Sequence, residues 1–405
     1  MQRYSEYKDS GVQWLGEIPS HWEVKRLRNF LTLFSEKGFG DSQLLSVTRE
    51  KGVILRDKEN KDENHNFVPD DLNGYKHLYA GDFVVNKMKS WQGSYGVSDY
   101  EGIVSPAYFT CKLKGVNPKF FSRAIRSKAY VAFFMQYSKG IRVDQWDLDP
   151  NSMKDIPFVL PNKKEQEAIV NYLDSVTSKI DIAIAQQQKM IDLLNERKQI
   201  IINNAVTKGL NPNVKMKDSG VEWIGEIPEH WEVRRLKHIA KLQSGETISS
   251  DYFTEDGYPV FGGNGFRGFT NRYTNEGDYV LIGRQGALCG NVNYAYGRFY
   301  ASEHAVVVYP YKLENIVWLG EVIRASNLNQ YSQSAAQPGL AVSLIQNICY
   351  PYPPYEEREK IALFIERQIK AIEDVVKNYQ RQIFLLQERK QIIINDVVTG
   401  KVKVV

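Results

Sequence analysis

The amino-acid sequence predicts an α+β protein with two mixed, strand-rich domains joined by two long antiparallel helices that form a coiled-coil spacer. Three observations carry this prediction. Two motifs each occur twice in the same order, the stretches between them differ, and each half ends in a long heptad pattern of apolar residues. The result is a pseudo-two-fold internal repeat. We expect the strand-rich domains at 1–161 and 209–353, and the helices at 162–208 and 354–405.

Two motifs open and close the halves of the chain. The opening motif, D-S-G-V-x-W-x-G-E-I-P-x-H-W-E-V, spans 9–24 and returns at 218–233. The closing motif, E-R-K-Q-I-I-I-N, spans 196–203 and returns at 388–395. The segments between the motifs differ in sequence between the two halves, which indicates one scaffold that carries two different surfaces.

The helices are predicted from apolar residues that recur at steps of three and four. Pro161 and Pro353 precede the helices, and Gly209 and Gly400 lie where the helices should end. A helix from about residue 163 to 206 would be roughly 65 Å long, far longer than one small domain needs. The predicted seam residues are Ile169, Leu173, Val176, Ile180, Ala183, Met190, Leu194 and Ile201, and then Ile361, Ile365, Ile372, Val375, Leu386 and Ile393.

Strand-like segments occur at matching places in the two variable domains. Residues 82–85 and 108–111 in the first domain correspond to 278–282 and 304–309 in the second. These segments are rich in β-branched and aromatic residues, as strands are. We therefore expect one fold with two diverged surfaces.

Composition is typical of a soluble globular protein. Of 405 residues, 42% are hydrophobic and 25% are charged, and the net charge of +4 neither requires nor excludes a nucleic-acid partner. No apolar run reaches membrane-spanning length, and the first residues do not resemble a signal peptide. The three cysteines lack C-x-x-C spacing, which favours reduced thiols. We expect a cytoplasmic protein without a membrane partner.

Two short matches to methyltransferase motifs lack the context that catalysis needs. Residues 261–265 fit the F-x-G-x-G pattern of methyl-donor binding but do not lead into a helix. Residues 352–355 match a Pro-Pro-aromatic motif, but Tyr352 stands where an amide or carboxylate must contact the target amine. No phosphate-binding G-x-x-x-x-G-K-[ST] loop occurs, and the six histidines lack metal-ligand spacing. The sequence therefore predicts no catalytic residue, cofactor or metal site, and a structural or docking role for His21 and His230.

Both motifs and the helix starts, Glu165-Gln166 and 357–360, resemble the specificity subunit of type I restriction–modification systems, over essentially the whole chain. The resemblance implies two target-recognition domains, each of which reads half of a split site in double-stranded DNA. It implies that two modification subunits dock on the repeated elements and supply S-adenosylmethionine and methyl transfer. It also implies restriction subunits that add translocation and cleavage driven by ATP and Mg. None of these cofactors is expected on this chain.

DNA contacts need basic and amide side chains on loops, because Lys and Arg neutralise phosphates while Arg, Lys, Asn and Gln read base edges. Lys87 and Arg284 lead the candidates, since each follows one of the matching strand segments. The predicted DNA-binding residues of the first domain are Lys87, Lys89, Trp91, Gln92, Tyr95, Arg142 and Gln145. Those of the second domain are Asn264, Arg267, Arg272, Arg284, Gln285, Arg298 and Gln337.

Two other functions stay open on the residues alone. The chain could be a coiled-coil scaffold whose globular domains bind proteins rather than DNA, with the duplicated surfaces serving identical partners. It could also be a self-sufficient methyltransferase. Affinity for duplex DNA across a salt series tests the first alternative, and methyl transfer by the purified chain alone tests the second.

Overall fold

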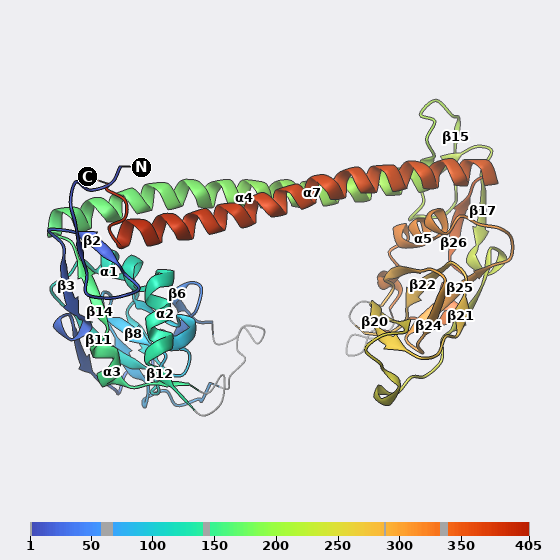
Figure 1. Cartoon of the computed structure of the whole chain (residues 1–405). Coiled ribbons are helices and arrows are strands. Elements are labelled where there is room, and N and C mark those ends of the chain that lie inside the picture. The colour runs from blue at the N-terminus through green and yellow to red at the C-terminus, as the bar shows by residue number, and fades with distance from the viewer. Residues whose placement is uncertain (1, 58–67, 141–145, 287–288, 333–338, 405) are drawn as a thin grey trace. The chain divides into compact units, whose positions relative to one another are not determined.

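The structure of the protein is a computed structural model that describes residues 2–57, 68–140, 146–286, 289–332 and 339–404. The chain forms two compact units: unit 1 comprises residues 1–187 and 381–405, and unit 2 comprises residues 188–380. Figure 1 labels the two long helices, α4 (Lys163–Lys208) and α7 (Tyr355–Val398). Each unit therefore contains one globular part together with a segment of each long helix.

The opening motif folds in the same way in both units. In unit 1 it forms the antiparallel pair β1 (Tyr7–Asp9) and β2 (Glu17–Pro19), and then β3 (Glu23–Arg26), which pairs with β14 (Pro157–Leu160). In unit 2 the same pairings join β15 (Met216–Asp218) to β16 (Glu226–Pro228), and β17 (Glu232–Arg235) to β26 (Cys349–Tyr352). Because β14 and β26 run directly into α4 and α7, the motif fixes where each helix starts.

The His-Trp pair of the opening motif binds a carboxylate in the first turn of a long helix. In unit 1 the indole N–H of Trp22 donates to Oε1 of Glu165 at 3.4 Å, and Nε2 of His21 lies 2.9 Å from Oε2. A carboxylate at this place also interacts favourably with the helix dipole. The same two contacts recur in unit 2, at 2.9 and 2.6 Å, from Trp231 and His230 to Glu357.

The same tryptophan also packs against the end of the other long helix. Gly400 (φ +77°) ends α7 against Trp22, and Gly209 (φ +75°) ends α4 against Trp231. A Cβ on Gly400 would lie 2.4 Å from Cδ of Pro19, so only glycine allows this approach. The predicted helix stops are therefore confirmed.

We expect Trp22→Ala to lower the free energy of unfolding of unit 1 by about 3–5 kcal/mol, because a fully buried indole is replaced by a cavity. The matched control is Leu313→Ala, whose side chain is 79% exposed and should change stability by less than about 0.5 kcal/mol. Denaturant unfolding of the two variants measures both values. Equal stability of Trp22→Ala and the unsubstituted chain would contradict a role for Trp22 in holding the start of α4 against the end of α7.

Both globular parts are built around the same four-stranded antiparallel sheet. In unit 1 the strands lie in the order β4 (Leu31–Phe34), β11 (Phe109–Leu113), β8 (Phe83–Val85) and β9 (Tyr95–Val97). In unit 2 the order is β18 (Ala240–Ser244), β25 (Ala305–Pro310), β22 (Tyr279–Gly283) and β23 (Val292–Ala295). The predicted strand segments fall in β8, β11, β22 and β25, so the expected α+β class and shared fold are confirmed.

Each unit adds its own elements to this sheet. In unit 1 these are β5 (Leu45–Thr48), β6 (Gly52–Leu55), β7 (Lys76–Leu78), β10 (Gly102–Val104), β12 (Ser138–Lys139), β13 (Asp147–Leu148), α1 (Pro118–Ile125), α2 (Lys128–Tyr137), α3 (Pro150–Lys154), η1 (Leu27–Asn29) and η2 (Ser90–Gln92). In unit 2 they are β19 (Tyr258–Gly262), β20 (Gly265–Thr270), β21 (Asn275–Glu276), β24 (Arg298–Ala301), α5 (Ile316–Ala325), α6 (Val342–Ile345), η3 (Leu236–His238), η4 (Ser250–Tyr252) and η5 (Leu328–Tyr331). The main core of each unit joins the central sheet to these helices and to the start of α4 or α7. None of the described helices has the length and apolarity that a bilayer crossing requires.

The seam of the long helices departs from the prediction at two residues. Met190 and Val375 were expected in the seam but are exposed, and Ile191 is buried in place of Met190. The other predicted seam residues are buried or half-buried. The error arises because Met190 and Ile191 are both apolar and lie three and four residues after the half-buried Gln187, and the apolar pattern allows either step.

Within each unit, the segments of α4 and α7 run antiparallel and are linked by equivalent ion pairs. In unit 1, Nζ of Lys390 lies 2.6 Å from Asp181, and in unit 2, Nζ of Lys198 lies 3.4 Å from Glu373. Both lysines belong to the closing motif. Exposed pairs of this kind are worth only about 0–1 kcal/mol, so they favour one register without carrying the stability of the helix pair.

Candidate nucleic-acid interfaces

Of the predicted DNA-binding residues of unit 1, Lys87, Lys89 and Trp91 lie near the paired strands β12 and β13. Lys87 and Lys89 follow β8, and the backbone N–H of Leu148 in β13 donates to the carbonyl of Lys87 at 3.1 Å. The rings of Trp91 and Trp146 lie 5.4 Å apart, which joins the segment after β8 to the segment before β13. The structure therefore brings together two groups that are far apart in the sequence.

Lys87 is the best-placed cation of this surface. Its Nζ binds Oδ2 of Asp147 at 2.9 Å, and both side chains are partly exposed. An exposed pair is worth about 0–1 kcal/mol, so a phosphate or a base edge can replace the carboxylate at little cost. Gln92 is half-buried, and its backbone N–H donates to the carbonyl of Lys89 at 3.1 Å. Arg142 and Gln145 lie outside the described residues.

The prediction for Tyr95 is wrong because this side chain belongs to the core. Tyr95 begins β9, pairs with Val85 of β8, and is completely buried. Its ring stacks on Phe134 of α2 at a centroid distance of 3.9 Å. Burial raises the pKa of the Tyr95 hydroxyl well above its ordinary value. No strand pattern marks β9 in the sequence, so a buried tyrosine could not be distinguished from a tyrosine in a loop.

One further lysine of this surface was not predicted from the sequence. Lys76 lies in β7, and its Nζ donates to the backbone carbonyl of Tyr108 at 2.6 Å. Partial burial, and then the nearby charges of Lys37 and Lys87, lower the pKa of Lys76. Lys76 and Asn86 both bind Tyr108, since the amide of Asn86 donates to the Tyr108 hydroxyl at 3.2 Å, and Lys87 is the next residue along the chain. Such a cluster suits phosphate or an electron-rich base edge.

In unit 2 the corresponding surface gathers around Arg284 and Gln285, which follow β22. The backbone N–H of Arg284 donates to the carbonyl of His304 at 2.8 Å, and the N–H of Leu340 donates to the carbonyl of Arg284 at 2.9 Å. Gln285 is exposed. Gln337 lies outside the described residues.

The hairpin β19–β20 adds two predicted residues to this surface. Asn264 lies in its turn, and Oδ1 of Asn264 accepts a hydrogen bond from Nδ2 of Asn291 at 3.0 Å. Arg267 lies over Gly262, where a Cβ would be 2.4 Å from its Cδ. Both predicted residues are exposed.

Arg272 and Arg298 lie at the opposite end of the β19–β24 pair from Asn264. Arg298 begins β24, two residues before the strand pairs with β19, and its Nε binds Glu276 at 3.2 Å. Arg272 follows the last pair of the hairpin, and its guanidinium lies 4.0 Å from the ring centre of Tyr252. The structure therefore does not group these two arginines with Gln285.

The methyltransferase-like segments have structural roles. Residues 261–265 form the turn of the hairpin β19–β20, not a strand-to-helix loop. Tyr352 ends β26, and its hydroxyl donates to Oε1 of Glu314 at 2.6 Å. The guanidinium of Arg358 lies 4.2 Å from the Tyr352 ring centre and binds Glu314 at 2.8 Å. Both segments are accounted for without a methyl donor.

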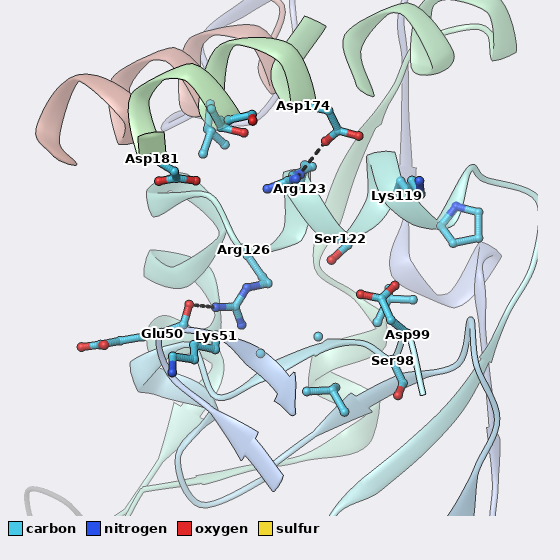
Figure 2. A pocket seen from close by; sticks show the side chains of 18 of the residues that line it. Glu50, Lys51, Ser98, Asp99, Lys119, Ser122, Arg123, Arg126, Asp174 and Asp181 are labelled. Atoms are coloured by element: carbon cyan, nitrogen blue, oxygen red, sulfur yellow. Dashed lines mark hydrogen bonds and ion pairs between the residues drawn. The ribbon is translucent and has the colours of Figure 1, made fainter. Parts of the chain in front are cut away.

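Unit 1 also contains a cleft of about 1420 Å³ between α1, the β5–β6 turn and segments of α4 and α7 (Figure 2). Arg123 binds Asp174 across it at 2.8 Å, and Arg126 donates to the carbonyl of Glu50 at 2.7 Å. Charges of both signs line the cleft, so it lacks the uniform positive potential that a phosphate backbone favours. Among the described residues, no group of His, Cys, Asp or Glu could hold a metal ion.

Comparisons with known proteins agree on one family. Residues 228–380 match the family model described as "Type I restriction modification DNA specificity domain". The chain is 43% identical over 139 residues to the type I restriction enzyme EcoprrI specificity subunit of Escherichia coli, a match that spans 33% of this chain and 35% of that protein. It is 25% identical over 96% of both chains to the putative type I restriction enzyme MjaX specificity subunit of Methanocaldococcus jannaschii.

The fold agrees with a solved structure. A chain solved in work on complex assembly and conformational transition of the type I R-M system has a TM-score of 0.70 at 14% identity, with coverage of 95% of this chain and 99% of that one. This likeness concerns the fold alone, whereas the sequence matches extend over one third to nearly all of the chain. The chain is therefore similar to type I restriction–modification specificity subunits, at 43% identity over one third of its length and at 25% identity over nearly all of it.

Proposed function

We propose that this chain is the non-catalytic DNA-recognition subunit of a type I restriction–modification complex, and that each unit reads one half of a bipartite site. The observation that carries the proposal is one sheet used twice with different side chains after equivalent strands. Lysines, Lys76 and Lys87, gather beside β8 in unit 1, whereas Arg284 and the amides of Asn264 and Gln285 gather beside β22 in unit 2. The shared sheet gives both units the same frame, and the differing side chains give each its own half-site.

Phosphate contacts should make the affinity for DNA strongly dependent on salt. Each Lys or Arg that neutralises a phosphate releases counterions, so log K falls linearly with log salt concentration. Binding of duplex DNA by this chain together with its modification subunit, measured across a salt series, tests the proposal. A linear decrease supports it. No affinity for duplex DNA at any salt concentration would favour a scaffold that binds proteins.

Docking of two modification subunits is supported by exposed apolar side chains at equivalent positions of both long helices. In α4, Leu193 and Ile200 are 48% and 53% exposed, and in α7, Leu385 and Ile392 are 48% and 58% exposed. The members of each pair lie seven residues apart, on one face of the helix. Identical partners need identical docking surfaces, and an apolar pair present in each helix provides one to each partner.

We expect the double substitution Leu193→Asp with Ile200→Asp to remove one modification subunit from the complex, because two carboxylates cannot be buried in an apolar interface without a large cost. Mass photometry of the co-expressed complex measures the stoichiometry. The matched control is Ile182→Asp, which is 55% exposed but has Asp374 at the equivalent position of the other helix. This control should assemble fully. Normal assembly of the double variant would contradict docking at this face.

The remaining parts of the complex follow from this role. The modification subunits would bind S-adenosylmethionine and transfer the methyl group, and the restriction subunits would use ATP and Mg for translocation and cleavage. This chain would supply the sequence-specific recognition of DNA, and it would act in the cytoplasm. The purified chain alone, mixed with labelled methyl donor and DNA, is expected to transfer no methyl group.

A further inference from the structure

Two asparagine side chains on the surface of unit 2 are joined into one polar group. Nδ2 of Asn291 donates to Oδ1 of Asn264 at 3.0 Å, and both side chains are exposed. Gln285 lies beside them, since a Cβ on Gly263 would be 3.0 Å from the Gln285 carbonyl oxygen. We call Asn264 and Asn291 the amide pair.

Close packing holds the amide pair in place. Asn264 is in the turn of the hairpin β19–β20, and the following Gly265 has a φ of +90°, which favours glycine. A Cβ on Gly265 would lie 2.8 Å from Oδ1 of Asn293, so the turn lies directly against this side chain. Asn291 directly precedes β23 and bonds Asn264, so the turn contacts both Asn291 and Asn293. The amide pair is thus positioned before any ligand arrives.

The hydrogen bond between the two amides leaves one amide nitrogen and one amide oxygen, on adjacent groups, with no part in that bond. Each amide carries an NH₂ donor and a carbonyl acceptor, and the bond uses the acceptor of one and a donor of the other. The two atoms that this bond leaves wholly unused are therefore Nδ2 of Asn264, a donor, and Oδ1 of Asn291, an acceptor. Exchanging oxygen and nitrogen in both amides reverses the roles but leaves the same donor–acceptor combination.

This combination matches the major-groove edge of adenine, which presents N7 as an acceptor and the N6 amino group as a donor. Guanine presents two acceptors at the same edge, O6 and N7, and would place an acceptor against the free carbonyl of the amide pair. In unit 1 the corresponding region holds Lys76 and Lys87, which have donors only. The two units therefore differ in the kind of base edge that they suit.

We propose that the Asn264–Asn291 amide pair reads an adenine in the half-site recognised by unit 2. The proposal rests on the proposed function, because it assumes that unit 2 contacts DNA bases. It assigns Asn291, which the sequence did not single out, as a specificity-determining residue together with Asn264.

The first test maps the bases methylated by the complex of this chain with its modification subunit. With Asn264→Ala or Asn291→Ala, one adenine position in the half-site of unit 2 should accept other bases, and preference for adenine there should fall about 5- to 150-fold. Asn264→Asp should have the same effect, since it keeps the acceptor for Asn291 but lacks the NH₂ donor. Asn213→Ala, an exposed amide in the segment after α4, is the control and should leave the motif unchanged.

The second test uses the unsubstituted complex and DNA in which 7-deazaadenine replaces each adenine of that half-site in turn. Loss of the N7 acceptor should weaken binding at one position, and Asn264→Ala should abolish that sensitivity. If the unsubstituted complex methylates no bipartite site, the proposed function itself fails. If the site is bipartite but the variants keep every adenine preference, or no 7-deazaadenine position weakens binding, only the assignment of the amide pair is overturned.

Discussion

Replacing residues 30–155 with the corresponding residues of a relative of different specificity is expected to change one half of the target sequence and leave the other half unchanged. This segment runs from β4 to the end of α3 and holds Lys76 and Lys87, while β3 and β14 stay in place on either side. The opening motif and the start of α4 are therefore untouched, so folding and docking should persist. The effect should be large, because each wrong base pair in a site costs about 1–3 kcal/mol.

Mapping methylated positions in cells that express the exchanged chain with its modification subunit measures this outcome. The reciprocal exchange of residues 240–347, which lie between β17 and β26, is the matched control and should change only the other half. A change in both halves, or in neither, would show that the units do not read separate half-sites.

Lengthening both long helices by one heptad is expected to increase the separation of the two half-sites by about 3 base pairs. Seven helical residues add about 10 Å, and base pairs are stacked at about 3.4 Å. The insertions belong after Gln187 in α4 and after Gln380 in α7, where the chain passes between units, so that the ion pairs Lys390–Asp181 and Lys198–Glu373 are preserved. The spacing is read from the methylated motif.

A heptad inserted into α4 alone is the mismatched control. The inserted chain is then seven residues longer than α7 between the two sets of helix contacts, and both sets cannot form without strain. We expect failed assembly or an altered separation. An unchanged motif after the paired insertion would refute the idea that the helices set the spacing.

Much of the fold could be predicted from the sequence because the motifs that form the scaffold occur twice in it. The repeated motifs locate the helix starts at Glu165 and Glu357 and the helix ends at Gly209 and Gly400, and an error in one copy is checked by the other. The prediction failed within the seam, where Met190 was chosen because it is apolar. The helix instead buries Ile191, the next residue, while the polar Gln187 does lie in the seam, where its amide donates to Gln382 at 2.9 Å.

The candidate DNA-binding residues could be predicted only in part, since they lie in the segments of the sequence that do not repeat. Position after a matching strand located Lys87 and Arg284, but residue type alone could not separate the buried Tyr95 from the exposed Asn264. Lys76 and Asn291 were missed because their roles depend on contacts with residues distant in the sequence. Such contacts exist only once the sheet has formed, so no local pattern reports them.

One measurement tests the central claim most directly: genome-wide mapping of methylated positions after co-expression of this chain with its modification subunit. Two units with different surfaces in one scaffold predict a bipartite motif, with two unlike half-sites separated by a fixed number of unspecified base pairs. A continuous motif, or two identical half-sites, would contradict the account.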